Sequence, residues 1–198
     1  SLGGRILLID LDPQYNLTQT FFEMDIADAS AAADKSVISL FERSRIHARD
    51  ASSPAESWLT LSIEPFAPAP RETLMHDLMG EGSPGGRLDL ISGQFEISKY
   101  AFATDGAALA RIKQHFLQTV ERYRSEYDLI VFDTNPNATF LTRCALEAAD
   151  RVLAPMHADV YSLRGVRLLN QVINEQIEPE KRPDLSILFN AVSRSEQS

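Results

Sequence analysis

The chain is poor in several kinds of residue, and each shortage narrows what the protein can be. Among 198 residues there is a single cysteine, Cys144, which excludes an internal disulfide and a cysteine-rich zinc site. No apolar run approaches the roughly 20 residues of a membrane-spanning helix, and the sequence does not open on a signal peptide. We therefore expect a cytoplasmic protein.

Basic residues are also in the minority, with 19 Lys and Arg against 28 Asp and Glu, for a formal net charge of −9. This acidity argues against a protein that binds nucleic acid over its whole surface, because lysine and arginine make the phosphate contacts. The charge is uneven, since residues 151–198 hold six basic and six acidic residues and are neutral. The remaining composition, 44% apolar and 24% charged, is that of a globular protein.

Short apolar runs alternate with stretches of helical periodicity. The runs, which predict buried strands, are residues 6–9, 129–132, 152–155 and 185–189. Apolar residues spaced three and four apart predict helices over 105–125, 138–149 and 162–177. Strands that alternate with helices indicate an α/β fold, a mostly parallel twisted sheet with helices on both faces. The length predicts a single domain over residues 1–198.

The middle of the chain is less regular. We expect short helices after Ser36 and over residues 74–78, the second ending at Gly80, and a strand over residues 88–91. Prolines between residues 50 and 70, and the glycine-rich residues 80–86, predict loops.

Two of the predicted strands end in aspartate. Asp10 and Asp12 close the first strand and, two positions apart, project to the same side of an extended backbone, while Asp133 closes another. Ligands of open α/β sheets bind beyond the carboxyl ends of the strands, and carboxylates suit Mg²⁺. With a magnesium-bound phosphate, such aspartates would form a phosphoryl-transfer site. The alternative is turn chemistry, because Asp and Asn before Pro favour turns.

These residues carry a family resemblance. RILLIDLDPQ, residues 5–14, followed by Asn16-Leu17-Thr18, resembles the second strand and first switch of ParA/Soj-type partition ATPases. This is the deviant-Walker group of P-loop NTPases that also contains MinD. The run that starts at Tyr127, YDLIVFDTNPNATFLTRCALEAADRVLAPMHADVYSLRGVRLLNQVI, resembles the family's Walker B strand, second switch and next β-α unit. LDLISGQFEIS, residues 88–98, resembles the segment before its long helix.

The resemblance assigns roles by position. It implies that Asp12 is the switch aspartate, which orders the attacking water and the magnesium shell, and that Asp133 is the Walker B aspartate, which holds Mg²⁺ through water. Asp10 matches the strand-end acid beside Asp133 and is a candidate cofactor-binding residue, and Asn190 falls where the family often has an asparagine that contacts adenine. Asn135 stands where the family usually has proline, which places the geometry of the second switch in question.

The family's phosphate loop, KGGxGKT, is missing, since no GxxxxGK[ST] occurs in these residues. A phosphate site needs consecutive backbone N–H groups at a helix N-terminus and a lysine. We therefore expect a piece of a longer protein that lacks the P-loop strand and helix and the C-terminal elements. It would be inactive as it stands, with an exposed sheet edge or apolar face.

For the intact protein, the resemblance implies an ATPase that binds ATP and Mg²⁺, forms a homodimer, binds nonspecific DNA and responds to a ParB-like partner. It would act in plasmid or chromosome partitioning, associated with the nucleoid and without stable membrane attachment. Arg194 and other late arginines are candidate DNA contacts. Two alternatives remain: a non-catalytic interaction module with the same fold, and a MinD-like membrane-positioning ATPase, which needs an amphipathic C-terminal helix.

Overall fold

The computed structural model describes residues 3–23, 36–42, 59–63, 66, 71–79, 86–135, 137–157 and 160–190. Most of the two predicted loops, Pro136 and Arg194 lie outside the described residues. The chain forms two compact units, Ser1–Asn135 and Pro136–Ser198, and each is described by itself. The single domain expected from the length stays a prediction.

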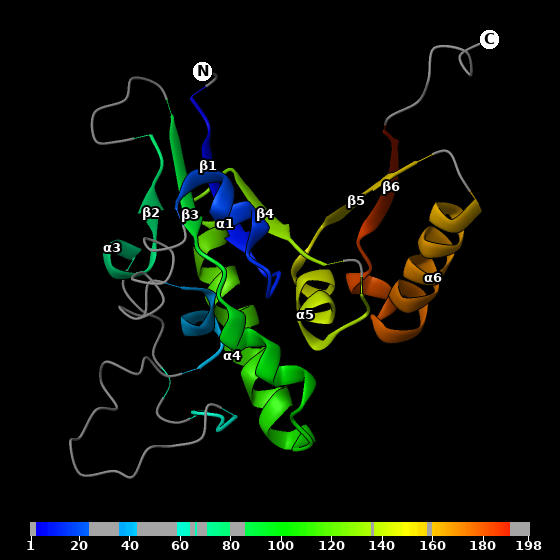
Figure 1. Ribbon diagram of the computed structural model, residues 1–198, viewed down its shortest axis with the longest axis horizontal. Helices are drawn as coiled ribbons and strands as arrows, with labels where there is room; N and C mark the ends of the chain where they lie inside the picture. Colours follow the sequence, from blue (N-terminus) through cyan, green and yellow to red (C-terminus); the bar gives the residue numbers. More distant parts are fainter. Residues whose placement is uncertain are drawn as a thin grey trace. The chain divides into compact units, whose positions relative to one another are not determined.

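The first unit is built on a four-stranded sheet in the order β2-β3-β1-β4 (Figure 1). The strands are β1 (Arg5–Asp10), β2 (His76–Asp77), β3 (Arg87–Ile91) and β4 (Leu129–Asp133). β1 pairs in parallel with β3 and β4, and the two-residue β2 runs antiparallel to β3. The predicted α/β class and its parallel strands are confirmed.

One face of this sheet is covered by α4 (Gly106–Arg124). The helix begins where the carboxylate of Asp105 accepts the N–H groups of Ala107 and Ala108. The ring of Phe116 lies 5.7 Å from that of Phe132 on β4, so the apolar stripe of α4 packs on the sheet. The core between them is formed by Leu7, Ile9, Ile91, Ile112, Phe116 and Val120.

The other face of the sheet is partly bare at β4. Leu129 is 51% exposed and Val131 38% exposed, although both belong to an apolar run that predicts burial on both faces. Burial on both faces is therefore wrong for β4, the last strand in the order of the described sheet. The exposed side chains of Leu129 and Val131 agree with the expected apolar face, and the exposed sheet edge stays a prediction.

Several short elements surround the sheet. They are α1 (Asn16–Phe21), η1 (Val37–Leu40), α3 (Arg71–Leu74) and η3 (Phe95–Ala101). The helix predicted over 74–78 is wrong, because α3 ends at Leu74 and His76 pairs with Leu90 of β3. Residues 76–77 form a strand because they pair with β3, and this pairing outweighs their weak helical periodicity.

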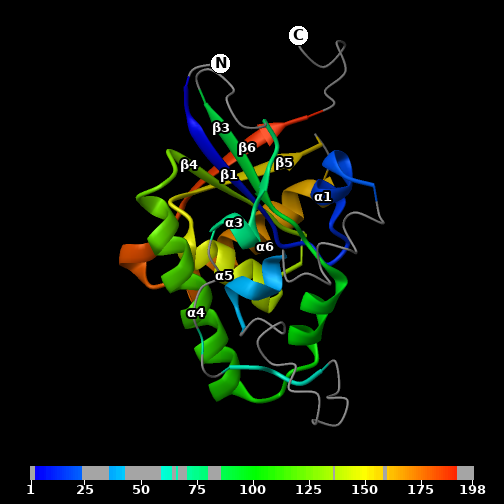
Figure 2. The ribbon, with the colours of Figure 1, turned by 90° about the vertical axis from the view of Figure 1, so that its left-hand side faces the viewer.

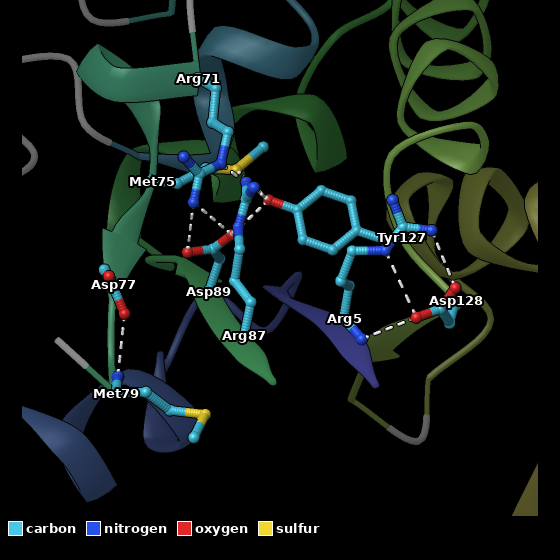
Figure 3. A network of polar contacts seen from close by, with 9 residues as sticks. All are labelled: Arg5, Arg71, Met75, Asp77, Met79, Arg87, Asp89, Tyr127 and Asp128. Carbon is cyan, nitrogen blue, oxygen red and sulfur yellow. Dashed lines mark hydrogen bonds and ion pairs between the residues drawn. The ribbon is translucent and has the colours of Figure 1, made fainter. Parts of the chain in front are cut away.

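A polar cluster lies inside the first unit around Asp89, a fully buried carboxylate on β3 (Figure 3). The guanidinium of Arg71 donates to both of its oxygens at 2.8 Å, and Arg87 pairs with it as well. The hydroxyl of Tyr127 donates to the same carboxylate. The pKa of Tyr127 is raised, mainly by burial and also by this hydrogen bond. The cluster ties α3, β3 and the start of β4 together.

The second unit contains a parallel pair of strands, β5 (Arg151–Met156) and β6 (Asp184–Phe189). Its helices are α5 (Phe140–Ala148), α6 (Val160–Gln176) and the short η4 (Pro179–Lys181), and Figures 1 and 2 show α6 against the strand pair. The buried centre is Leu146, Ile173 and Ile177, with Val152, Leu169, Val172 and Leu185 packed around it. The positions of these strands and helices confirm the sequence prediction. The burial predicted for the two apolar runs is wrong, because the side chains of Leu153, Leu188 and Phe189 are each more than half exposed. No helix among the described residues is long and apolar enough to span a bilayer.

Candidate functional site

The carboxyl ends of β1 and β4 bring three aspartates together in the first unit. Asp10 and Asp133 are partners in the parallel register, and the N–H of Leu11 donates to the carbonyl of Asp133 at 2.8 Å. Asp12 lies two residues after Asp10, just beyond the end of β1. Burial raises the pKa of Asp133, and the negative charge of Asp12 raises it further. The meeting of these side chains, expected because parallel strands end at one edge, is therefore present.

Asp10 is fully buried and its carboxylate is enclosed by donors. Oδ2 accepts the hydroxyl of Thr18 at 2.6 Å and its N–H at 2.9 Å, and Oδ1 accepts the N–H of Asp12 at 3.2 Å. Burial raises the pKa of Asp10, the hydrogen bonds from Thr18 and Asp12 oppose this rise, and the nearby charge of Asp133 adds to it. Asp10 therefore acts in this structure as an internal acceptor for α1.

Asp12 is partly exposed and organises the turn that follows β1. Its Oδ1 accepts the N–H of Gln14 at 2.9 Å, and its carbonyl accepts the N–H of Tyr15 at 2.8 Å. Tyr15 has φ of 43°, the left-handed region that is uncommon for a residue other than glycine, and α1 begins directly after it. Asp12 therefore forms a turn, which was the alternative role expected from the sequence, and it also belongs to the group of aspartates.

Two residues that the sequence reasoning did not single out complete the surroundings of Asp10. The N–H of Gly93, two residues beyond β3, donates to the hydroxyl of Thr18 at 2.8 Å. A Cβ at Gly93 would lie 2.8 Å from Cγ of Asp10 and 2.7 Å from Cβ of Tyr15, so no side chain fits there. The only signal in the sequence is a glycine just beyond a predicted strand.

The other predicted positions are located as follows. Asn190 belongs to the second unit, where it follows β6 and its N–H donates to the carbonyl of Met156 at 2.8 Å. Asn135 lies two residues after β4. Cys144 is buried in α5, as expected. The structure thus groups Asp10, Asp12 and Asp133 in the first unit, and Asn190 belongs to the second unit.

The three aspartates are suited to a hydrated Mg²⁺ ion that is bound to the phosphates of a nucleotide. Within the part of the chain that the structure describes, no three His, Cys, Asp or Glu side chains form a metal cage. Mg²⁺ does not require one, because it keeps several waters and binds through one or two carboxylates together with phosphate oxygens. The partly exposed Asp12 and Asp133 can supply those carboxylates, because the charge of Asp12 acts on Asp133 and both lie at the end of the sheet.

The chain is similar to known proteins in sequence and in fold. A model of the AAA domain family matches residues 1–187. The chromosome-partitioning ATPase Soj of Thermus thermophilus is 28% identical over 188 residues, 94% of this chain and 56% of Soj. The structure of pNOB8 ParA bound to nonspecific DNA is 23% identical, with a TM-score of 0.64 over 97% of this chain and 60% of that one. Cobyrinic acid a,c-diamide synthase of Mycobacterium smegmatis, with bound ATP analog and magnesium, is 17% identical with a TM-score of 0.55, over 93% of this chain and 60% of that one.

The chain therefore spans a little over half of these proteins, 56% of Soj and 60% of the two structures. The two structural likenesses concern the fold alone. The family model covers nearly the whole chain. The chain belongs to the AAA domain family, and the resemblance to ParA/Soj-type partition ATPases seen in its sequence is confirmed.

Proposed function

We propose that the chain is the larger part of a ParA-like ATPase domain that hydrolyses Mg-ATP in plasmid or chromosome partitioning. The observation that carries this proposal is the group of Asp10, Asp12 and Asp133 at the carboxyl ends of β1 and β4. Three carboxylates in one place repel one another, and burial raises the pKa of two of them. A divalent cation relieves that repulsion.

In this proposal Asp12 and Asp133 hold the magnesium shell, and Asp12 also orients the attacking water. Bound Mg²⁺ would neutralise charge on the transferring phosphate. Asp12 suits the catalytic role because its side chain is partly exposed at the edge of the sheet, whereas Asp10 is fully buried. We assign Asp10 the part of supporting the segment that carries Asp12. Asn190 remains the proposed contact of the adenine ring.

The phosphate loop would come from sequence other than these 198 residues, because GxxxxGK[ST] does not occur in them. The proposal is supported by a solved structure of this fold with an ATP analog and magnesium. Its partitioning role is supported by the likeness to Soj.

Homodimer formation, nonspecific DNA binding and a ParB-like partner are part of the same proposal. The pNOB8 ParA structure was solved with nonspecific DNA. The formal charge of −9 describes only these 198 residues and does not exclude DNA binding by a dimer face of the intact protein. We place the intact protein in the cytoplasm at the nucleoid.

A non-catalytic interaction module is the second candidate, and Asn135 and the absent phosphate-loop motif favour it. The two candidates differ in turnover. The test uses the protein as its gene encodes it and measures ATP hydrolysis with Mg²⁺ and with EDTA. The ATPase proposal expects turnover that requires Mg²⁺. Absence of turnover would favour the module instead, and absence of nucleotide binding as well would contradict both the ATP-binding and the ATPase parts.

The DNA-binding part has its own test. Fluorescence anisotropy of a random-sequence duplex should rise with the protein in ATP more than in ADP, and the affinity should fall steeply with added salt, as contacts to phosphates require. Equal binding in both nucleotides, or none, would contradict this part of the proposal.

A further inference from the structure

A single hydroxyl group connects three elements of the first unit around the site. Thr18 of α1 is fully buried, and its hydroxyl donates to Oδ2 of Asp10 at 2.6 Å. The hydroxyl oxygen of Thr18 also accepts the N–H of Gly93, beyond the end of β3, at 2.8 Å. The hydroxyl proton and one lone pair therefore both have defined partners, which fixes the orientation of the group.

The chain of contacts continues to the backbone of Asp12. Oδ2 of Asp10 is held by Thr18, and its other oxygen, Oδ1, accepts the N–H of Asp12 at 3.2 Å. Asp12 in turn sets the turn before α1 through its carbonyl and the N–H of Tyr15. A displacement of the Asp10 carboxylate would release the N–H of Asp12 and shift the backbone from which the Asp12 side chain extends.

The contact on the β3 side has no room to adjust. The α-carbon of Gly93 packs so closely that an added Cβ would meet Cγ of Asp10 at 2.8 Å and Oδ2 at 3.0 Å. Real Cβ atoms essentially never show a contact as short as 2.8 Å, so a side chain would displace the carboxylate. The backbone beyond β3 is held in place from its own side, because the N–H of Val37 donates to the carbonyl of Ser92 at 2.8 Å.

We propose that Thr18 is a positioning residue of the ATPase site: its hydroxyl, held between the N–H of Gly93 and the carboxylate of Asp10, fixes the backbone that presents Asp12. The inference rests on the proposed function, since it names what holds the catalytic aspartate. Thr18 itself touches neither nucleotide nor metal in this scheme. Gly93 serves the same end, because only glycine lets the end of β3 approach Asp10.

The test uses the protein as its gene encodes it, with three variants and a matched control. Thr18→Val keeps the shape of threonine and removes both hydrogen bonds of the hydroxyl, whereas Thr18→Ser keeps the hydroxyl. Gly93→Ala adds the Cβ that would displace Asp10, and Gly106→Ala is its control, because nothing lies within 4 Å of a Cβ there. For each variant, kcat and KM for Mg-ATP are measured, together with hydrogen exchange at the Gly93 amide.

Thr18→Val and Gly93→Ala should lower kcat by about 10- to 100-fold, the usual effect of losing a residue that orients a ligand, with a smaller change in KM. Thr18→Ser should stay within about threefold of wild type in kcat, and Gly106→Ala should be unchanged. Exchange at the Gly93 amide should be faster in Thr18→Val and normal in Thr18→Ser.

The contrary results are equally distinct. If Thr18→Val loses the protection of the Gly93 amide yet turns over ATP as wild type does, Thr18 is structural only and the inference fails. If Thr18→Ser does not restore kcat, the hydroxyl is not the operative group. Should Thr18→Val fail to fold, Gly93→Ala against Gly106→Ala decides alone. A wild-type protein without turnover would instead refute the proposed function.

Discussion

The ammonium group of Lys99 lies 2.7 Å from Oε1 of Glu42, and both side chains are buried in the first unit. The hydroxyl of Tyr100 donates to the same carboxylate at 2.7 Å, and the N–H of Ser62 donates to its other oxygen at 2.7 Å. The carbonyl of Thr60 accepts from Lys99 at 3.0 Å. This network holds residues 60–62 against η1 and η3.

Removing one charge of this pair should strongly destabilise the first unit. Glu42→Gln leaves Lys99 buried without its counterion, and we expect a loss of about 3–5 kcal/mol in the free energy of unfolding. Chemical denaturation followed by fluorescence measures it. Glu121→Gln, in the exposed pair of Glu121 with Arg124 on α4, should change the free energy by less than about 1 kcal/mol. A loss equally small at Glu42 would show that the buried pair is not intact.

The cluster around Asp89 gives a second stability prediction. Tyr127→Phe removes the phenol hydroxyl that donates to the buried Asp89 and leaves that carboxylate one donor short. We expect a loss of about 1–3 kcal/mol in the free energy of unfolding. Because the pKa of Tyr127 is raised, the wild-type phenol should also stay neutral in alkaline solution above its ordinary range, which absorbance at 295 nm would detect. Early ionisation would contradict the contact.

The contribution of Asp10 and Asp133 to the free energy of unfolding should rise as the pH falls towards the ordinary pKa of aspartate. Both have pKa values raised above the ordinary value of 3.8, so the folded state binds their protons more tightly than the unfolded state does. Their contribution is therefore complete below that value and is lost as the pH rises through the folded-state pKa. The difference between wild type and Asp133→Asn, measured by urea denaturation between pH 4 and pH 7, isolates one of the two acids. At pH 7 the Asp133→Asn variant should have a larger free energy of unfolding than wild type. This difference in free energy should shrink as the pH falls towards 4.

The bare face of β4 should promote self-association of the 198-residue chain. Leu129 and Val131 together present apolar surface on an edge strand of the described sheet, the arrangement that invites pairing with another chain. Val131→Lys should shift sedimentation towards the monomer at a given concentration. Gln118→Lys, on an exposed position of α4, adds the same charge and should leave the distribution unchanged. Equal effects of both changes would point to net charge as the cause.

Much of this fold could be predicted from the sequence because its main signals are local. The apolar runs of β1 and β4 end sharply at aspartates, and α4 carries a long helical stripe. β2 could not be predicted, because two residues form a strand only through pairing with β3. The exposure of β4 depends on what covers it, which no local pattern contains.

The same division holds at the site. The meeting of Asp10 with Asp133 follows from the rule that parallel strands end at one edge, and it needs no knowledge of register. The parts played by Thr18 and Gly93 depend on the alignment of Ile9 with Ile91, which places the turn after β3 beside Asp10. Hydrophobic periodicity does not encode that alignment, so these residues emerge only from the structure.

The central claim is that Asp12 serves Mg-ATP hydrolysis, and turnover by Asp12→Ala in the protein as its gene encodes it tests that claim most directly. Asp77→Ala, at an exposed aspartate of β2, is the control. We predict that Asp12→Ala lowers kcat at least about 100-fold, the contribution typical of a group that handles the attacking water, while Asp77→Ala keeps wild-type turnover. Hydrolysis by Asp12→Ala at the wild-type rate would contradict the account.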